Sequence, residues 1–360
     1  MNGAAELARS ESFTHPIEIV GLTPSDFARW DAFVDSAPQA SFFHRAGWKT
    51  VFEQAFGYRT HFLLAQVNGV IEGVLPLAEI KGPLFGYVFG HSLTSIPFAD
   101  YGGIAATTER AREALDKAAQ VLALRLGVDC LEYRNRVPEH EDWPKSELYF
   151  LFRKAIDPDV EKNLLAIPRK QRAMVRKGIS NGLLSEIDNN VDRLFPLYAD
   201  NVHRHGTPPL SKKYFALLKA VFGKDCEILI ITKDGQSISG VMSFYFRDEV
   251  IVHHPGDLPA ARALAANDFK YWEVMRRACE RGCRVFDYGR SKRGTGPFDF
   301  KKNWGFEPTP LHYEYKLVRA TEVPEKNPLN PKYQLVIATW RRLPIGVANW
   351  LGPHIVKYLG

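Results

Sequence analysis

The 360-residue sequence lacks several features that define large classes of proteins. It has no apolar run of about eighteen residues, so we expect no membrane-spanning helix. The first residues, MNGAAELARSESF, lack the apolar core of a signal peptide. Its four cysteines, at positions 130, 226, 279 and 283, do not have the spacing of zinc ligands, so no metal site is expected. These absences together predict a reduced, cytoplasmic protein.

The chain does have an ordinary share of core-forming residues and an excess of positive charge. Hydrophobic residues make up 45% of the sequence and charged residues 24%, which is enough to bury globular cores. The formal net charge is +6 at pH 7 and the isoelectric point is about 9.0. This balance favours an anionic partner such as a nucleotide, a phospholipid or RNA, without choosing among them.

One pattern occurs twice in the chain. Residues 126–134 (LGVDCLEYR) and 281–289 (RGCRVFDYG) share a glycine, an apolar residue, an acid and a tyrosine at matching positions. Each copy is preceded by two apolar segments joined by Asn-Gly or Asp-Gly, at residues 61–80 and 226–246. Because these dipeptides are strong signals of a β-hairpin, the sequence predicts a tandem repeat of one module.

Each module is predicted to be an α/β (α+β) domain with a mixed, mostly antiparallel sheet flanked by helices. Hairpins precede a single crossover helix, expected at residues 260–281 in the second module, so a doubly wound sheet is not expected. The alternating residues 312–318 are predicted to form the final strand of that module. The predicted organisation is a flexible N-terminus at 1–16, modules at 17–155 and 156–320, and a proline-rich linker with amphipathic helices at 321–360.

Residues 281–306 predict a strand, a basic glycine-rich loop and an aromatic–lysine segment. Five cations fall within thirteen residues, against the single acid Asp299; they are Arg290, Lys292, Arg293, Lys301 and Lys302. Glycines let backbone N–H groups approach a ligand, and the cations supply charge, so the segment favours a phosphate-bearing ligand. A solvated surface loop is the alternative.

A second cationic segment, PRKQRAMVRKG at residues 168–178, lies between the modules. At helical spacing, Arg169, Arg172 and Arg176 share one face, and no acid occurs from Asn163 to Leu184. A cationic helix face is often simply solvated, but a solvated helix usually balances its charges and this one does not. An anion-binding face and a solvated face are therefore both possible interpretations.

The order of these motifs resembles that of the Fem-type (FemAB-like) aminoacyl and peptidyl transferases, which are tandem-domain members of the N-acetyltransferase (GNAT) superfamily. The resemblance spans about residues 17–318 and rests on the tandem modules, RKQRAMVRKGISNG, DYGR after a strand, and FDFKKNWGF. Within this family the chain looks most like the Fem-related proteins found beside exosortase and exopolysaccharide gene clusters.

The resemblance implies a chemistry and its partners. Family members transfer an amino acid from aminoacyl-tRNA to an amine of a cell-envelope precursor, for peptidoglycan or exopolysaccharide. The acceptor carries a nucleotide or lipid diphosphate. No covalent intermediate, cofactor or metal is implied.

The resemblance also implies catalytic groups. Lys301 or Lys302 matches the lysine that the family places near the reacting carbonyl, and Lys301 has the better spacing from Phe298 and Phe300. Asp100, in the loop PFADYGG, matches an acid considered as a general base, although it is also typical of a turn before glycine. His254, in a pair of histidines at a strand end, is a further acid–base candidate.

Other matches concern the acceptor. Trp48 and Lys49 match an early tryptophan segment, and Arg204 and Tyr214 match an arginine–tyrosine spacing in the second module, while Trp48 alone is also typical of a core. The predicted substrate-binding set is Trp48, Lys49, Tyr101, Arg172, Arg176, Arg204, Tyr214, Tyr288, Arg290, Lys292, Arg293 and Phe298.

One departure bears on the donor. Ordinary acetyltransferases of the superfamily hold the pyrophosphate of coenzyme A on a glycine-rich turn before the crossover helix. Here that place reads LPAARALAAND, with alanines in place of glycines, which argues against a standard coenzyme A site. An acyl-CoA-dependent N-acyltransferase nevertheless stays an alternative, as does a non-enzymatic envelope scaffold or RNA-binding module.

The last residues form an aromatic and basic tail, LVIATWRRLPIGVANWLGPHIVKYLG. Pro344 and Pro353 are expected to divide it into short helices with an apolar face that includes Trp340 and Trp350. This face either docks on the second module or lies in a membrane interface, which would place the protein peripherally on the inner face of the plasma membrane.

Overall fold

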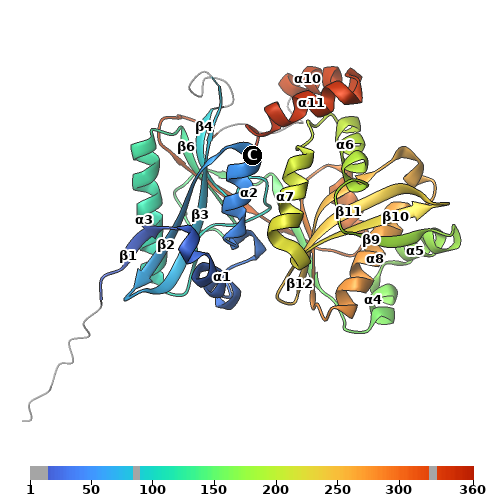
Figure 1. Cartoon of the computed structure of the whole chain (residues 1–360), viewed down its shortest axis with the longest axis horizontal. Helices are drawn as coiled ribbons and strands as arrows, with labels where there is room; N and C mark the ends of the chain where they lie inside the picture. The colour runs from blue at the N-terminus through green and yellow to red at the C-terminus, as the bar shows by residue number, and fades with distance from the viewer. Residues whose placement is uncertain (1–14, 84–89, 324–330) are drawn as a thin grey trace, which may run out of the picture.

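The computed structural model describes residues 15–83, 90–323 and 331–360. They form two α/β modules that lie side by side, with a pair of helices across the top (Figure 1). The predicted flexible N-terminus falls mainly on residues 1–14, and most of the predicted linker falls on 324–330, so both lie outside the described residues.

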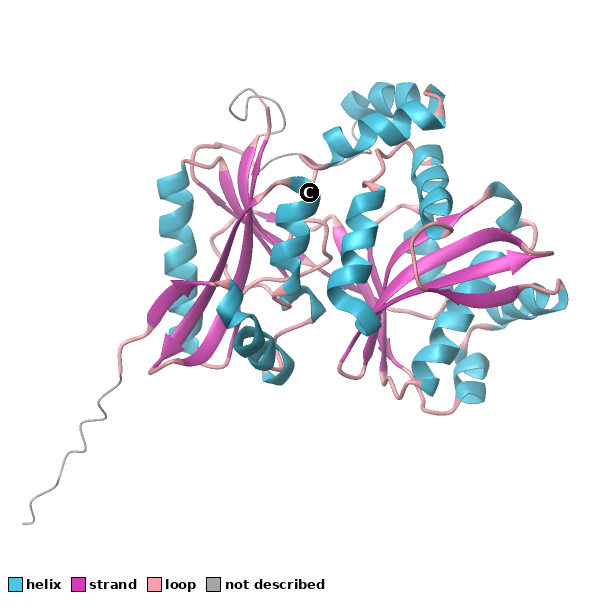
Figure 2. Cartoon of the chain, viewed as in Figure 1, coloured by secondary structure: helices cyan, strands magenta, loops and turns pink. Residues whose placement is uncertain are grey.

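The first module is a twisted, mostly antiparallel sheet between helices (Figure 2). α3 (Glu109–Leu126) covers its outer face, and α1 (Phe27–Ser36) and α2 (Gly47–Phe56) cover the face turned to the second module. Its strands run in the order β1 (Glu18–Gly21), β2 (Arg59–Val67), β3 (Val70–Lys81), β4 (His91–Ser95), β6 (Cys130–Asn135), β15 (His312–Leu317) and β7 (Lys145–Ser146), with β5 (Ala105–Ala106) beside β3.

The second module repeats this plan. α8 (Ala266–Glu280), α4 (Val160–Ala166) and α5 (Arg169–Ser180) lie on its outer side, and α6 (Leu194–Arg204) and α7 (Lys212–Phe222) on its inner side. Its strands run in the order β14 (Pro308–Pro310), β8 (Tyr149–Ala155), β13 (Val285–Lys292), β12 (Glu249–Asp257), β11 (Gln236–Phe246), β10 (Cys226–Lys233) and β9 (Leu184–Asp188).

Turn chemistry explains the hairpins, which the sequence predicted correctly. Asn68 and Gly69 turn β2 into β3 with φ of 48° and 80°, and Asp234 and Gly235 turn β10 into β11 with φ of 50° and 78°. Positive φ at both central residues gives the turn a twist that matches the strands it joins, and this conformation is favourable only for Asn, Asp and Gly.

The repeated Gly-to-Tyr pattern marks the crossover in each module. α3 leads from the β4 side of the sheet to β6, and α8 leads from β12 to β13; in both modules the two strands are parallel. The predicted crossover helix of the second module is therefore confirmed, with α8 preceded by a 3₁₀ turn at Pro259–Arg262.

The two sheets exchange strands. β15 pairs with β6 in the first sheet, so the prediction that residues 312–318 close the second module is wrong about the partner. Conversely, β8 belongs to the N-terminal half of the chain but pairs with β13 in the second sheet. The modules are thus linked by crossing strands and are not simply consecutive along the chain.

An aromatic core fills the junction between the modules. Phe42 stacks on Phe244 with ring centroids 4.4 Å apart, and Trp48 lies 5.3 Å from Phe222. All four rings are buried, so the inner helices of both modules share one continuous core. This core fixes the relative position of the two modules, on which the candidate site depends.

The C-terminal residues form a helical hairpin of α10 (Pro331–Arg342) and α11 (Ile345–Val356). The predicted break at Pro344 is present, whereas Pro353 lies inside α11. None of the described helices is long and apolar enough to cross a membrane.

Candidate active site between the two modules

The candidate site lies where the parallel strands of the second module part. β12 and β13 are paired with each other only from Glu249 to Ile251, and further along each strand pairs with its other neighbour, β11 or β8. A loop of the first module enters at this point and brings Asp100 against Gly289. With φ of 68° and a hypothetical Cβ only 2.8 Å from Asp100 Oδ2, position 289 accommodates only glycine without strain.

Asp100 and Arg290 form an ion pair across the module boundary. Arg290 Nε lies 3.3 Å from Asp100 Oδ1, and its Nη1 donates to the Ala99 carbonyl at 3.0 Å. Tyr313 of β15 donates to the Asp100 carbonyl at 2.7 Å and accepts from Arg290. Arg290 is therefore held by several polar groups and does not lie in a solvated loop. One of these groups, Tyr313, comes from the exchanged strand β15.

Lys301 points into the same centre from α9 (Gly296–Asn303). Its Nζ donates to the carbonyls of Gly289 at 3.1 Å and Arg290 at 3.0 Å, and it lies 5.7 Å from the centre of the Tyr288 ring. Burial lowers the pKa of this amine to about 8, against the opposing pull of the Asp100 and Asp287 charges. The ammonium therefore has two N–H groups engaged and one left for a ligand.

Asp287 is a second buried acid at the site, and the substrate-site prediction omitted it. Its carboxylate accepts from Tyr101 Oη and from Gly289 N, both at 2.7 Å. Burial, followed by the negative charges of Glu249 and Asp100, raises its pKa to about 7. The repeated acid–tyrosine pattern was the sequence signal that could have identified it.

Of the paired histidines, His253 faces the site. Its Nδ1 lies 3.9 Å from Asp100 Oδ2, whereas His254 contacts Tyr214 Oη at 3.3 Å inside the core. A bulge in β12 leaves His253 as the extra residue between two paired positions and changes the direction of its side chain. Burial lowers the pKa of both histidines, and the acid–base role of His254 stays a prediction for a side chain that contacts Tyr214.

The remaining predicted residues are spread over three places. Trp48, Tyr214 and Phe298 are buried packing residues, so none of them offers a surface to a ligand. Lys49 is bonded to Glu53 at 2.6 Å, and Arg204 to Asp200 at 2.7 Å. Those near the site are Tyr101, Tyr288, Arg290 and Lys292, the last lying 5.1 Å from the Tyr149 ring, while Arg293 is exposed over Phe150.

A cationic face lies on the outer side of the same module. α5 carries Arg169, Lys170, Arg172, Arg176 and Lys177, none of which forms an ion pair with another described residue. Arg172 donates to the Leu165 carbonyl at 2.7 Å and the other four are exposed. The end of α9 touches the start of α5, since a Cβ on Gly305 would lie 3.3 Å from Pro168. Lys302 is exposed three residues before this contact.

The start of α8, where a coenzyme A pyrophosphate would be expected, is occupied by other groups. Asp268 in the first helical turn accepts from Trp304 Nε1 at 2.9 Å. The end of α5 packs on the same turn, with Asn181 donating to the Leu264 carbonyl at 3.0 Å. An acid in the first turn opposes an anion there, so these residues do not fit a pyrophosphate.

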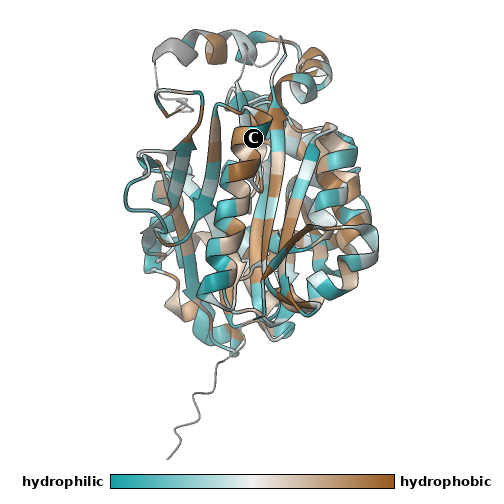
Figure 3. Cartoon of the chain, turned by 90° about the vertical axis from the view of Figure 1, so that its left-hand side faces the viewer, coloured by the Kyte–Doolittle hydropathy of each residue, from teal (hydrophilic) through white to brown (hydrophobic). Residues whose placement is uncertain are grey.

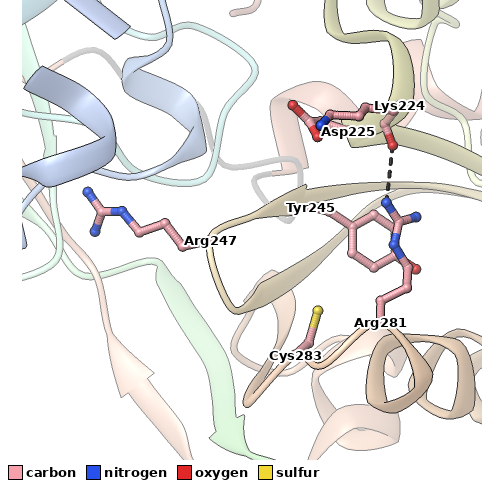
Figure 4. A pocket seen from close by; sticks show the side chains of 6 residues that line it. All are labelled: Lys224, Asp225, Tyr245, Arg247, Arg281 and Cys283. Carbon is pink, nitrogen blue, oxygen red and sulfur yellow. Dashed lines mark hydrogen bonds between the residues drawn. The ribbon is translucent and has the colours of Figure 1, made fainter. Parts of the chain in front are cut away.

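Two cavities elsewhere on the molecule are not lined by Asp100 or Lys301. One, of about 190 Å³, lies at the β11–β12 turn (Figure 4), where Arg281 stacks 3.6 Å from the centre of the Tyr245 ring. In the same cavity Arg247 points towards the first module and donates to the Ala37 carbonyl at 2.7 Å. The other, of about 490 Å³, lies at the edge of the first sheet and is lined in part by Lys49. Neither cavity is therefore part of the candidate site around Asp100, Arg290 and Lys301.

Comparisons with known proteins identify a domain in the second module and a fold for the whole chain. Residues 167–302, from the start of α5 to α9, match the model of the acetyltransferase (GNAT) domain. The chain as a whole has a tandem GNAT-like fold, similar to the folds of the solved structures described next. No curated protein sequence matches it.

Solved structures share this fold at low identity. A crystal structure of FemX superposes with a TM-score of 0.65 at 14% identity, covering 89% of this chain and all (100%) of that one. The C-terminal domain of a putative lysylphosphatidylglycerol synthetase from Agrobacterium fabrum gives 0.55 at 15% identity, covering 81% and 91%. A tandem GNAT protein from the clavulanic acid biosynthesis pathway gives 0.54 at 12% identity, covering 85% and 100%.

Proposed function

We propose that this protein is a Fem-like acyl or aminoacyl transferase. It forms an amide on an amine of a cell-envelope precursor linked to a nucleotide or lipid diphosphate. The observation that carries the proposal is the meeting of Asp100, from the first module, with Arg290 and Lys301, from the second, at the point where the strands of a GNAT-like sheet part. The likeness to FemX over 89% of the chain adds support for the fold on which the proposal depends.

The proposed reaction is attack of the acceptor amine on an activated ester. A C–N bond forms, the C–O bond to the carrier breaks, and the proton lost by the amine leaves with the carrier hydroxyl. Lys301 has one N–H directed neither to Gly289 nor to Arg290, and this group stabilises the oxyanion of the tetrahedral intermediate. Asp100, held by Arg290, accepts the proton from the amine and passes it to the oxygen of the leaving carrier.

The donor is proposed to be an aminoacyl-tRNA. The cations of α5, which form no ion pair with other described residues, are proposed to provide a surface for several phosphates, with the exposed Lys302 between this surface and the site. The acid at the start of α8 disfavours coenzyme A at the usual place. The exposed Arg293 is proposed to contact the diphosphate of the acceptor.

The test is complementation of a deletion strain, followed by mass spectrometry of envelope precursors and glycans. Loss of one acyl or amino-acid increment is expected in the deletion, and recovery with the wild-type gene. Lys301→Ala should fail to restore it, whereas Lys213→Ala, which removes an exposed lysine of α7, should restore it fully. Recovery with Lys301→Ala at normal protein levels would remove Lys301 from the mechanism.

Lys302→Ala decides which of the neighbouring lysines acts. Because Lys302 is exposed and Lys301 is half-buried beside Asp100, we expect Lys302→Ala to retain transfer at reduced affinity for the donor. Complete loss with Lys302→Ala and none with Lys301→Ala would reverse the assignment.

The second candidate is an acyl-CoA-dependent N-acyltransferase, which the match to the acetyltransferase (GNAT) domain favours. Calorimetric titration with acetyl-CoA separates the two, because micromolar binding supports coenzyme A as the carrier. A non-enzymatic RNA-binding role predicts instead that RNA affinity depends on α5 and falls steeply with salt, while Lys301→Ala changes no envelope product.

A further inference from the structure

The C-terminal hairpin joins the two modules at one end of the molecule (Figure 1). Its helices pack on α6 of the second module, with Gly352 against Pro209. Its last residues reach the first module, where Tyr58 donates to the Lys357 carbonyl and Gly360 packs against Pro97. Pro97 belongs to the loop that carries Asp100, so the hairpin is fixed close to the candidate active site.

The two sides of α11 differ sharply in burial. Ala348, Gly352 and Val356, four residues apart, are buried against the protein body. On the other side, Val347 is 44% exposed and Trp350 is 70% exposed. A tryptophan this exposed is unusual, because the large ring is normally covered by packing.

Other apolar side chains of the C-terminal hairpin are exposed as well. Val336 on α10, Ile345 at the start of α11 and Leu359 are 62%, 43% and 46% exposed. Figure 3 shows hydrophobic and hydrophilic segments interspersed along the hairpin at the top of the molecule. We call the five side chains Val336, Ile345, Val347, Trp350 and Leu359 the apolar ridge.

The charged side chains of the C-terminal hairpin itself have one sign. The sequence from Pro331 to Gly360 contains no Asp or Glu. Arg341 and Arg342 are exposed at the turn of the hairpin, and Lys357 follows α11. Exposed apolar residues with tryptophan, flanked by cations and free of acids, match the surface of a bilayer that carries anionic headgroups.

We infer that the apolar ridge docks the protein on an anionic membrane surface. This inference deepens the proposed function: with the hairpin in the headgroup region, the loop of Asp100 lies near the bilayer, so the acceptor is lipid-linked and not nucleotide-linked. The ridge enters the boundary of headgroups and acyl chains, and the arginines stay in the headgroup layer.

The experiment is sedimentation of the full chain with vesicles, which needs no substrate. Binding is expected to vesicles of phosphatidylglycerol and phosphatidylcholine and to be much weaker to phosphatidylcholine alone. Trp350→Asp should reduce the binding constant by a factor of about ten or more, since it removes an exposed aromatic ring that enters the bilayer on docking. Arg342→Glu should reduce it by a factor of about five or more on anionic vesicles only.

The matched control is Leu124→Asp, which places the same charge on a side chain of α3 that is 67% exposed. It should bind vesicles like the wild type, and all variants should melt at similar temperatures because the altered side chains are exposed. No binding by the wild type, or equal loss with Leu124→Asp, would overturn the inference. So would concentration-dependent dimerisation in the absence of lipid that Trp350→Asp abolishes, because the ridge would then be an interface between two copies.

The test also separates this inference from the proposed function. Vesicle binding without transfer after complementation would leave membrane docking standing and remove the transferase. Transfer to a nucleotide-linked precursor, with no vesicle binding, would do the reverse.

Discussion

The side-chain amine of Lys301 is expected to be far more reactive at neutral pH than an exposed lysine. Burial lowers its pKa from 10.5 to about 8. That change corresponds to about 3 kcal/mol against the charged form and raises the fraction of free amine at neutral pH roughly 300-fold. Because the unfolded chain binds the proton more tightly, the stability of the fold should rise as pH increases from about 8 towards 10.5.

The assay is trace labelling with acetic anhydride across a pH series, with peptide mapping by mass spectrometry. Labelling of Lys301 should rise with a midpoint near pH 8, and exposed Lys213 serves as the internal reference. A midpoint for Lys301 near 10.5 would refute the reasoning, because the ammonium would then be solvated and the buried centre would not exist as described.

The same value predicts a pH dependence of transfer. If the ammonium stabilises the oxyanion, transfer should decline as pH rises through about 8, and the decline should be absent in Lys301→Arg, whose guanidinium stays charged. A rate that rises through the same pH would instead assign Lys301 as a base and contradict the proposed role.

Three further substitutions test the surroundings. Gly289→Ala forces an alanine into the left-handed backbone region, at a cost of about 1–2 kcal/mol, and its Cβ pushes the Asp100 carboxylate away. The rate of transfer should therefore fall at least about tenfold. Unchanged turnover would show that transfer does not depend on the observed position of Asp100. Asp287→Asn removes an acid whose pKa is raised in the folded protein from 3.8 to about 7, so the stability of the wild type should fall as pH rises from about 4 to about 7. Above pH 7 the variant should therefore be up to about 4 kcal/mol more stable than the wild type. Urea denaturation that shows no pH-dependent difference between the two proteins would contradict this. Phe244→Ala removes a ring stacked on Phe42 and should lower the free energy of unfolding by about 3–5 kcal/mol, with a loss below about 1 kcal/mol arguing against a shared core.

Local signals in the sequence predicted the repeated parts of the fold well. Asn68–Gly69 and Asp234–Gly235 determine their own turns, because positive φ at both positions is a property of those residues. The glycines at 127 and 282 likewise lie at positive φ where each crossover helix ends or has just ended. Such features depend on neighbours in sequence, so they can be recognised without the structure.

Pairing between distant segments could not be predicted in the same way. The alternation of residues 312–318 predicted a strand, but nothing in that pattern distinguishes β6 from β13 as its partner. The same limit applies to the site. The resemblance pointed to Asp100 and Lys301, but the role of Tyr313 follows only from the exchanged strand.

Packing geometry places two sets of predicted site residues where the sequence could not indicate. Trp48 and Tyr214 lie in segments that match acceptor-binding regions, yet both side chains are buried in the shared core. His253 and His254 are adjacent, and which one faces Asp100 depends on a bulge in β12 that neither residue type predicts.

The exchanged strands also determine how this chain can be made and divided. During synthesis β6 leaves the ribosome about 180 residues before β15. The edge of the first sheet at β6 therefore stays unpaired until nearly the whole polypeptide has been made. Cutting the gene between the repeats therefore yields two incomplete sheets, each prone to aggregate, and the native fold should be recovered only when both pieces are produced together.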